Sequence, residues 1–301
     1  MTVRARSVDN DKRQSPPHHV ILNADDFGSS ATVNEAVMQA YREGVLTSTS
    51  LMAGGPAMEE AAALARQAPG LAVGLHLVVV DGPPVLPPHE IPHLVDGRGQ
   101  FPPAPLGLGL KYAFHAGARR ELEREMEAQF ARFAETGLPL SHVDGHLHMH
   151  MHPTVLDLLL PLAARYGARG IRLPRDELLL ALRHDRRRAG VKVGWAIAFA
   201  LLTRRCLGRV RARGLVTTRR VYGLMQSGQM DQAYVLKVLA GLSVPTAEIY
   251  FHPDTKGTAD GLGPNRGDLE TLLSSEVRGI IEERELCSTT YPALAERSRT
   301  R

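Results

Sequence analysis

The chain has 301 residues, 44% of them hydrophobic, which is enough for one large domain with a substantial core. Its two cysteines exclude a disulfide framework, and no apolar run reaches the roughly 18 residues that a membrane-spanning helix needs. The net charge of +4 is uneven, because residues 183–220 hold twelve Lys or Arg and one acidic residue. That segment carries +11 and the remainder −7, so the basic character belongs to one region.

The order of apolar segments predicts one domain. Residues 1–18 are polar and lack the apolar stretch of a secretion signal, so we expect a disordered tail and a cytoplasmic protein. A single domain is expected at 19–292, followed by a short tail at 293–301. Within the domain, strand-like and helix-like segments alternate about seven times, which requires parallel strands in an open sheet or a barrel.

Two adjacent carboxylates follow the first predicted strand. The apolar run 20–22 is typical of a buried parallel strand, and Asp25 and Asp26 come soon after it. They are either functional or part of a solvated turn that caps the next helix, and both interpretations are open. His76 lies near the carboxyl end of a third strand at 71–77. Because such ends converge on one rim, we expect His76 close to the two aspartates.

Six side chains able to bind a metal occupy every even position from 142 to 152. They are His142, Asp144, His146, His148, His150 and His152. Alternate residues of an extended strand face the same side, so the extended part of this run presents a column of imidazoles with one carboxylate. Pro153 and the apolar periodicity after it predict a helix there. We therefore expect one or two of the six to bind a metal, and others to orient them or contact substrate.

Polar residues also end later strands. Arg172 follows a short strand, where it either contacts substrate or forms a surface ion pair. His252 ends a strand at 246–253. Polar residues at the ends of at least four strands favour a barrel, in which all ends surround one pocket. The Pro- and Gly-rich segment 80–109 reads as a long loop that covers substrate.

The basic segment contains a nearly apolar stretch at 191–202, with Trp195 as the only tryptophan of the chain. Arginines flank it at 186–188 and 204–205. Twelve residues are too few to span a bilayer, but they can lie in the interface of an anionic membrane. An outer helix packed on the body is the alternative. The segment lacks the interleaved aromatics of nucleic-acid binders, so we expect no nucleic-acid partner.

Three stretches resemble the YdjC-like carbohydrate deacetylases in order and spacing: Asn23-Ala-Asp-Asp-Phe-Gly28, Gly74-Leu-His-Leu77 and His142-Val-Asp-Gly-His-Leu-His-Met-His150. With Ile171-Arg-Leu-Pro174 and the insert at 183–213, the chain looks most like the branch associated with hopanoid biosynthesis. The resemblance implies an α/β fold, an incomplete TIM-like (β/α)7 barrel. It also implies metal-dependent removal of N-acetyl groups from an acetylated amino sugar carried on a hopanoid lipid, with soluble chito-oligosaccharides as the alternative substrate.

Carried over by position, the resemblance implies that Asp26, His76 and His146 bind one divalent metal ion, with Zn²⁺ or Mg²⁺ favoured. Two imidazoles and a carboxylate leave open positions for a water and an amide oxygen. Asp25 is then the general base. The hypothesis for the general acid is His252, although it stands in His-Pro-Asp where relatives commonly have His-Pro-Gly.

The supporting residues complete the expected site. Asp144 or His148 is expected to hold a ligand ring by its second nitrogen, and Arg172 to contact substrate. Two other classes of protein remain as alternatives. His142-x-Asp144 with a distant His suits an iron-dependent oxygenase, but the βα alternation argues against the usual all-β scaffold. The other is a peripheral membrane-binding protein that acts through 183–213. The oligomeric state does not follow from the sequence.

Overall fold

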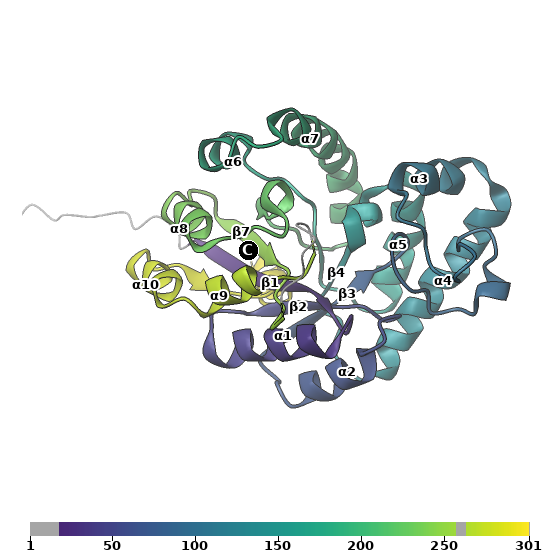
Figure 1. The fold of residues 1–301 in the computed structure, drawn as a ribbon, viewed down its shortest axis with the longest axis horizontal. Coiled ribbons are helices and arrows are strands. Elements are labelled where there is room, and N and C mark those ends of the chain that lie inside the picture. The colour runs from purple at the N-terminus through teal and green to yellow at the C-terminus, as the bar shows by residue number, and fades with distance from the viewer. Residues whose placement is uncertain (1–17, 257–262, 301) are drawn as a thin grey trace, which may run out of the picture.

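The computed structural model describes residues 18–256 and 263–300, and it shows a curled parallel sheet surrounded by helices (Figure 1). Seven strands are paired in the order β5-β4-β3-β2-β1-β7-β6, and each neighbouring pair is parallel. The strands are β1 (His19–Phe27), β2 (Ser48–Leu51), β3 (Ala72–Leu77), β4 (His142–Gly145), β5 (Gly170–Ile171), β6 (Arg220–Tyr222) and β7 (Thr246–Phe251). A short β8 (Cys287–Ser288) pairs with the amino end of β1.

The barrel is incomplete between β5 and β6. Across the described residues, this gap is bridged only by isolated pairs, Gly170 with Val216 and Arg175 with Val221. The remaining strands form one continuous ladder, so their carboxyl ends lie along a single curved rim. The predicted α/β fold, an incomplete (β/α)7 barrel, is confirmed.

Helices connect the strands and cover the sheet. They are α1 (Ala31–Glu43), α2 (Met58–Arg66), α3 (Pro105–Phe114), α4 (Ala116–Glu135), α5 (Pro153–Arg165), α6 (Leu178–His184), α7 (Ala189–Ala212), α8 (Gln232–Ala240), α9 (Arg266–Leu273), α10 (Ser275–Glu283) and α11 (Tyr291–Arg299). The described part of the chain also contains the short 3-10 helices η1 (Pro88–Glu90), η2 (His146–Met151) and η3 (Leu224–Gln226). Local signals set several boundaries: the Ser30 side chain accepts from Val33 N at the start of α1, and the Asp231 side chain accepts from Tyr234 N at the start of α8.

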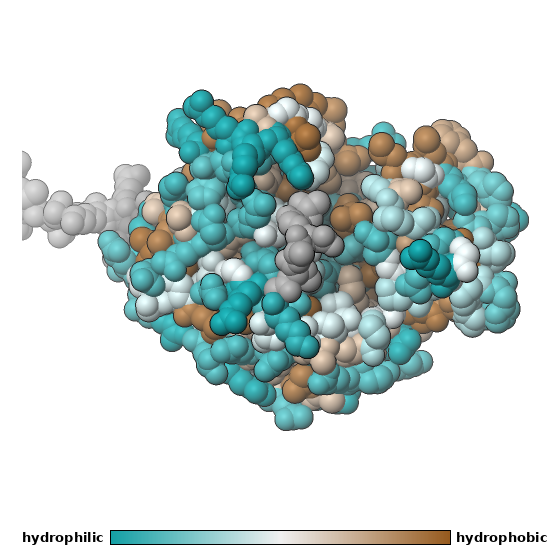
Figure 2. All heavy atoms as spheres, viewed as in Figure 1, coloured by the Kyte–Doolittle hydropathy of each residue, from teal (hydrophilic) through white to brown (hydrophobic). Residues whose placement is uncertain are grey.

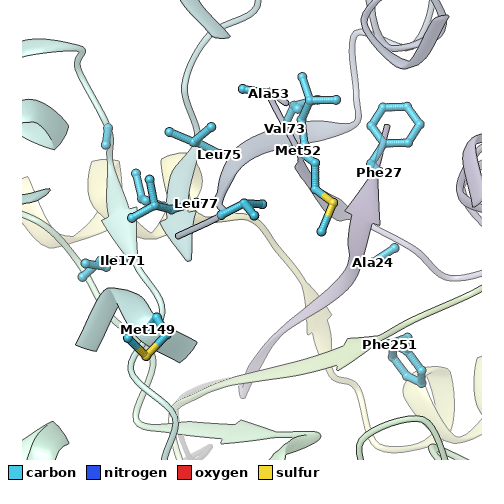
Figure 3. Close-up of a cluster of buried hydrophobic side chains, with 14 of the residues drawn as sticks. Ala24, Phe27, Met52, Ala53, Val73, Leu75, Leu77, Met149, Ile171 and Phe251 are labelled. Carbon is cyan, nitrogen blue, oxygen red and sulfur yellow. The ribbon is translucent and has the colours of Figure 1, made fainter. Parts of the chain in front are cut away.

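The core lies between the sheet and its helices, and it reaches the rim. Val20, Leu22 and Ala24 of β1 are fully buried, as expected for a strand covered on both faces. Figure 3 shows Phe27, Leu75 and Ile171 from three different strands in one cluster of buried apolar side chains. This packed layer supports the polar residues at the strand ends and holds them in fixed positions.

Several sequence-based boundaries differ from the structure. The composition of the segment 266–285 predicts a single acidic helix, but the structure has two. Ser274 has an extended backbone, and its hydroxyl accepts from Val277 N to cap α10. The expected loop 80–109 ends earlier, since α3 begins at Pro105. The segment expected as a tail, 293–301, is largely part of α11. Of the tail expected at 1–18, residues 1–17 lie outside the described ranges.

The basic segment 183–220 begins in the last turn of α6 and contains the whole of α7. The apolar stretch 191–202 lies entirely within α7, which begins at Ala189. Among the described residues, no helix combines the length and the hydrophobicity needed to cross a membrane.

Candidate metal centre

The carboxyl end of β1 carries two adjacent carboxylates that face the same side. A regular strand would point them to opposite faces. Here the pairing of β1 with β2 shifts between Ala24 and Phe27, and Asp26 has a left-handed backbone with φ of 62°. This irregularity brings oxygens of both Asp25 and Asp26 near the ring of His76. Because of this bulge, the carboxylates of Asp25 and Asp26 lie in one site.

Three ligand atoms from three elements form a nearly equilateral triangle. Asp26 Oδ1 lies 3.3 Å from His76 Nε2 and 3.5 Å from His146 Nδ1, and the two ring nitrogens are 3.4 Å apart. Metal–ligand bonds of about 2.1 Å place tetrahedral ligand atoms about 3.4 Å from one another. Asp26 Oδ1 is buried and has no hydrogen-bond partner within the described part of the chain. The residues present therefore fit a divalent ion.

The electrostatics of the triangle suit a cation. Burial by itself would raise the pKa of Asp26, but the imidazoles of His146, His76 and His252 hold it well below its usual range. Burial by itself would lower the pKa of His76, but the Asp144 carboxylate and the two aspartates of β1 raise it to about 9. A positive charge is thus favoured at this point, and a bound metal ion would replace the proton of His76.

Asp144, on β4, fixes the orientation of the His76 ring. Its Oδ1 accepts from His76 Nδ1 at 2.8 Å, and its Oδ2 accepts from the Ser50 hydroxyl at 2.6 Å. This hydrogen bond directs His76 Nε2 toward Asp26. A carboxylate that holds the far nitrogen of a histidine is the usual support of a metal-binding imidazole.

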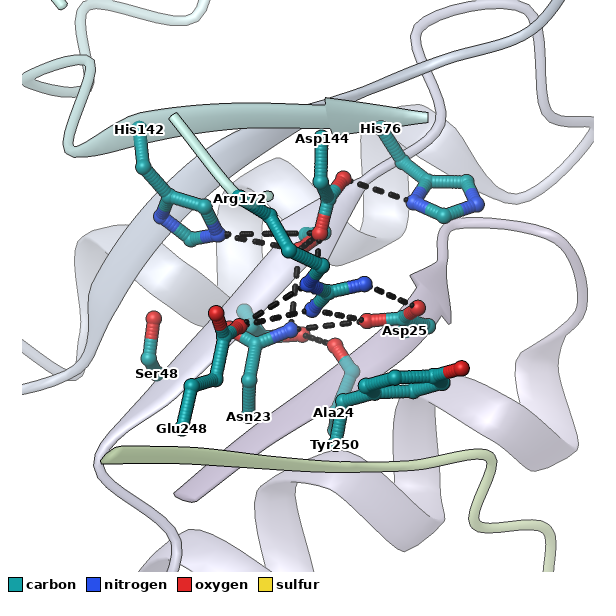
Figure 4. A network of polar contacts seen from close by, with 12 residues as sticks. Asn23, Ala24, Asp25, Ser48, His76, His142, Asp144, Arg172, Glu248 and Tyr250 are labelled. Carbon is teal, nitrogen blue, oxygen red and sulfur yellow. Dashed lines mark hydrogen bonds and ion pairs between the residues drawn. The ribbon is translucent and has the colours of Figure 1, made fainter. Parts of the chain in front are cut away.

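Arg172 lies beneath the site and binds three carboxylates (Figure 4). Its Nη1 and Nη2 donate to the two oxygens of Asp25 at 2.6 and 2.7 Å, and its Nε donates to Glu248 at 2.9 Å. The side chain is 0% exposed, so the surface ion pair that the sequence left open is wrong. Such a two-pronged pair fixes the direction of both oxygens of Asp25.

His252, at the end of β7, faces the same carboxylate. Its Nε2 lies 4.0 Å from Asp25 Oδ2, and its backbone N–H donates to Asp268 at 2.8 Å. His252 Nδ1 is buried without a hydrogen-bond partner among the described residues. The metal triangle, a carboxylate and a second imidazole thus lie together on one rim.

The histidine run does not stay extended, which corrects the expected column. Only His142–Gly145 is a strand, and Leu147 and His148 then adopt left-handed backbones with φ of 47° and 56°. His148 Nε2 lies 3.0 Å from the Tyr250 hydroxyl, and its ring contacts Phe199 of α7 edge-on. His148 therefore holds no ligand ring of the triangle. His150 is buried, and its Nε2 donates to the Arg172 carbonyl at 2.8 Å.

Sequence reasoning missed the polar residues that support Asp25. Asn23 donates to Asp25 Oδ1 at 2.8 Å and to the Ser50 hydroxyl at 2.9 Å. Glu248 is fully buried in β7 and accepts from the Tyr291 hydroxyl at 2.6 Å as well as from Arg172. A charged residue inside the otherwise apolar strand at 246–251 was the available signal, because a buried charge needs a partner.

Fold and site together define an α/β half-barrel protein with a candidate Asp/His metal site at the carboxyl ends of its strands. The chain belongs to the family of YdjC-like proteins, whose model matches residues 19–283. A solved structure from Enterococcus faecalis V583, described as a candidate cellobiose-phosphate cleavage protein, is similar over 92% of this chain and 99% of that one. Its TM-score is 0.68 and its sequence is 25% identical.

Two curated relatives match the chain in part. A carbohydrate deacetylase of Brevibacillus brevis is 44% identical over 147 residues, which are 49% of this chain and 56% of the relative. A chitooligosaccharide deacetylase of Serratia marcescens is 40% identical over 161 residues, 52% of this chain and 60% of the relative. The matches thus span between half and two thirds of the relatives' length.

Proposed function

We propose that this protein is a metal-dependent deacetylase that removes the N-acetyl group from an acetylated amino sugar. The observation that carries the proposal is the triangle of Asp26 Oδ1, His76 Nε2 and His146 Nδ1, with sides of 3.3 to 3.5 Å, beside the arginine-bound Asp25. Membership of the YdjC-like family and relatives named as deacetylases of carbohydrates support the same chemistry.

In this proposal Asp26, His76 and His146 hold one divalent ion. The ion would polarise the acetyl oxygen and acidify a water molecule, a contribution worth several kcal/mol in such enzymes. Zn²⁺ and Mg²⁺ are the candidates, since both accept nitrogen and oxygen ligands. Asp144 keeps the His76 ring in the orientation that offers Nε2.

The residues around Asp25 handle the protons. Asp25 accepts a proton from the water as the water oxygen attacks the acetyl carbon, and Arg172 holds its two oxygens in place. His252 is the proposed general acid. It donates a proton to the nitrogen as the C–N bond breaks, because an amine leaves poorly unless protonated. The products are acetate and the free amino sugar.

Two substrates fit this chemistry. The first is an N-acetylglucosaminyl group carried on a hopanoid lipid. The insert at 183–213 supports it, because an apolar helix flanked by arginines suits contact with an anionic membrane. The second is a soluble chito-oligosaccharide, favoured by the name of the Serratia marcescens relative.

The test is hydrolysis of each substrate by the purified, metal-loaded protein, followed by mass analysis for replacement of one acetyl group by hydrogen. We expect turnover of the lipid-linked sugar, and of the soluble oligosaccharide if the second assignment holds. Release of acetate from neither substrate would refute the proposal.

The variant Asp25→Ala separates the roles of the two aspartates. We expect a fall in turnover of at least about a hundredfold, since a general base contributes that much. Metal content measured by mass spectrometry should remain at the wild-type level. Loss of the metal from a folded Asp25→Ala protein would instead mean that the roles of Asp25 and Asp26 are exchanged.

A further inference from the structure

Exposed apolar side chains are concentrated on one part of the molecule. Across residues 18–256 and 263–300, all large hydrophobic side chains that are exposed belong to α3, η2, α6 or α7. They are Leu106, Leu110, Phe114, Leu147, Leu179, Val191, Val193, Trp195, Ile197 and Leu201. Scattered exposed leucines are ordinary on a protein surface, but this restriction to four elements marks a contact surface.

These four elements share an origin in the fold. α3 follows β3, η2 follows β4, and α6 and α7 follow β5, three strands that are neighbours in the sheet. All of them leave the carboxyl ends of parallel strands, which is the rim that carries the candidate metal centre. Leu147 makes the link direct, because it is 47% exposed and immediately follows His146. The apolar surface therefore adjoins the candidate metal centre at His146, whose side chain is partly exposed.

The two longer helices each present an apolar stripe. On α3, Leu106, Leu110 and Phe114 recur at every fourth position and are 85%, 63% and 83% exposed. On α7, Ile197 and Leu201 have the same spacing and are 59% and 64% exposed. η2 contacts both helices. Figure 2 shows the brown, apolar side chains over α7 and over α3 on the same face of the molecule.

Positive charge surrounds these stripes. Arg186, Arg187 and Arg188 precede α7, and Arg204 and Arg205 are exposed one turn beyond its apolar stretch. Arg119 and Arg120 are exposed in the first turn of α4, just after α3. Apolar side chains bordered by arginines match the acyl region and the anionic headgroups of a bilayer.

We propose that α3, η2 and α7 together form a docking face for an anionic lipid surface, with the rim that carries the metal centre turned toward the lipid. A second copy of the chain is a poorer occupant, because two segments that each carry +11 would repel one another. Docking itself stands apart from the enzymatic activity. The turning of the site toward a lipid-borne sugar rests on the proposed function.

The first experiment measures binding of the full chain to vesicles without any substrate. Vesicles of phosphatidylcholine with phosphatidylglycerol are compared with vesicles of phosphatidylcholine alone, by flotation. Trp195 is the only tryptophan and is 37% exposed, so its fluorescence reports the environment of α7. We expect binding and a blue shift with the anionic vesicles. Absence of binding to them would overturn the inference.

Two variants test whether both helices take part. Leu110→Glu on α3 and Ile197→Glu on α7 should each weaken binding to anionic vesicles about tenfold or more, since each replaces an inserted apolar group by a charge. Ala134→Glu, at an exposed position at the end of α4 that leads to the opposite rim, is the matched control and should bind like wild type. Equal binding by Leu110→Glu and the control would exclude α3 from the face.

Charge and self-association give the remaining outcomes. Replacing Arg204 and Arg205 together by Gln should lower the preference for anionic vesicles on the order of thirtyfold. The inference is wrong if two results are found together: the wild-type chain binds no vesicles, and it is a dimer that Ile197→Glu dissociates. The face would then be an interface between copies of the chain. Hydrolysis of a soluble N-acetyl oligosaccharide should be unchanged in Leu110→Glu. A protein that binds vesicles but hydrolyses nothing would disprove the proposed function while leaving the docking face intact.

Discussion

The two halves of the histidine run, 142–146 and 148–152, have the same alternating pattern but different surroundings. In the first half, His142 and Asp144 lie in β4, and Asp144 and His146 reach the candidate metal centre. In the second half, His150 bonds to a backbone carbonyl and His152 precedes α5. The difference arises at Leu147 and His148, where the backbone becomes left-handed. A period of two places side chains together only while the chain stays extended.

The strongest test of this difference compares His146→Ala with His148→Ala. Loss of His146 removes one corner of the triangle, so we expect loss of the metal and a fall in turnover of about a thousandfold or more. His148→Ala should retain the metal, because that ring faces Tyr250 and Phe199. Metal content per protein after gel filtration, with the rate of acetate release, gives the answer. Equal metal loss in both variants would remove the distinction between the halves.

Asp144→Asn tests the supporting role of the first half with a smaller expected effect. The amide cannot accept as strongly from His76 Nδ1, and it places a neutral group beside Arg172. We expect metal affinity to fall between about tenfold and a hundredfold, the usual range for such a supporting carboxylate. Competition with a chromogenic chelator measures the affinity. Ser50→Ala, which removes only one hydrogen bond to the same carboxylate, should have the weaker effect of the two.

The second half predicts a dependence of stability on pH. Burial lowers the pKa of His150 from 6.5 to about 4. The unfolded chain therefore takes up a proton at this residue as the pH falls below 6.5, whereas the folded chain does so only near pH 4. The stability contributed by His150 is complete above pH 6.5 and is lost as the pH falls toward 4, by about 2 kcal/mol at pH 5. Urea unfolding at pH 7.5 and at pH 5 measures this loss. In His150→Gln, the difference between the two free energies of unfolding should be smaller than in the wild type by about 2 kcal/mol.

The smallest effect is expected at His152. Its ring is partly exposed and packs near Gly109 of α3, and it forms no side-chain cap for α5. His152→Ala should cost less than about 1 kcal/mol in urea unfolding and leave metal content unchanged. A large loss of metal from this variant would mean that His152 takes part in the metal centre.

The fold could be predicted because its signals are local. Alternating apolar segments predict most elements without reference to distant residues, and in the structure the caps at Ser30 and Asp231 set the starts of α1 and α8. The break at Ser274 was missed because the segment 266–285 has helical composition throughout, and one capping hydroxyl divides it.

Asp144 could be proposed from the sequence as a support for a ligand ring, but the residues that hold Asp25 could not, since they depend on contacts between distant residues. From the sequence, Arg172 belongs either to a surface ion pair or to the substrate site, because a lone arginine after a strand has no visible partner in the sequence. Its partners Asp25 and Glu248 are 147 and 76 positions away. The bulge at Asp26 could not be predicted either, because the neighbouring residues do not indicate that this aspartate adopts a left-handed backbone.

The hydrogen bond from Tyr291 to Glu248 joins the last helix of the barrel to the charged cluster beneath the site. The cluster includes Asn23 and Asp25 of β1 as well as Tyr291 of α11, so its members are synthesised at the start and at the end of the domain. Asp25 and Arg172 are both present once the chain has been synthesised as far as residue 172. Glu248 is added with β7, and Tyr291, whose hydroxyl donates to Glu248, is added only with α11. The charged cluster is therefore complete only when the last helix is present, and its contacts close loops of 147, 76 and 43 residues.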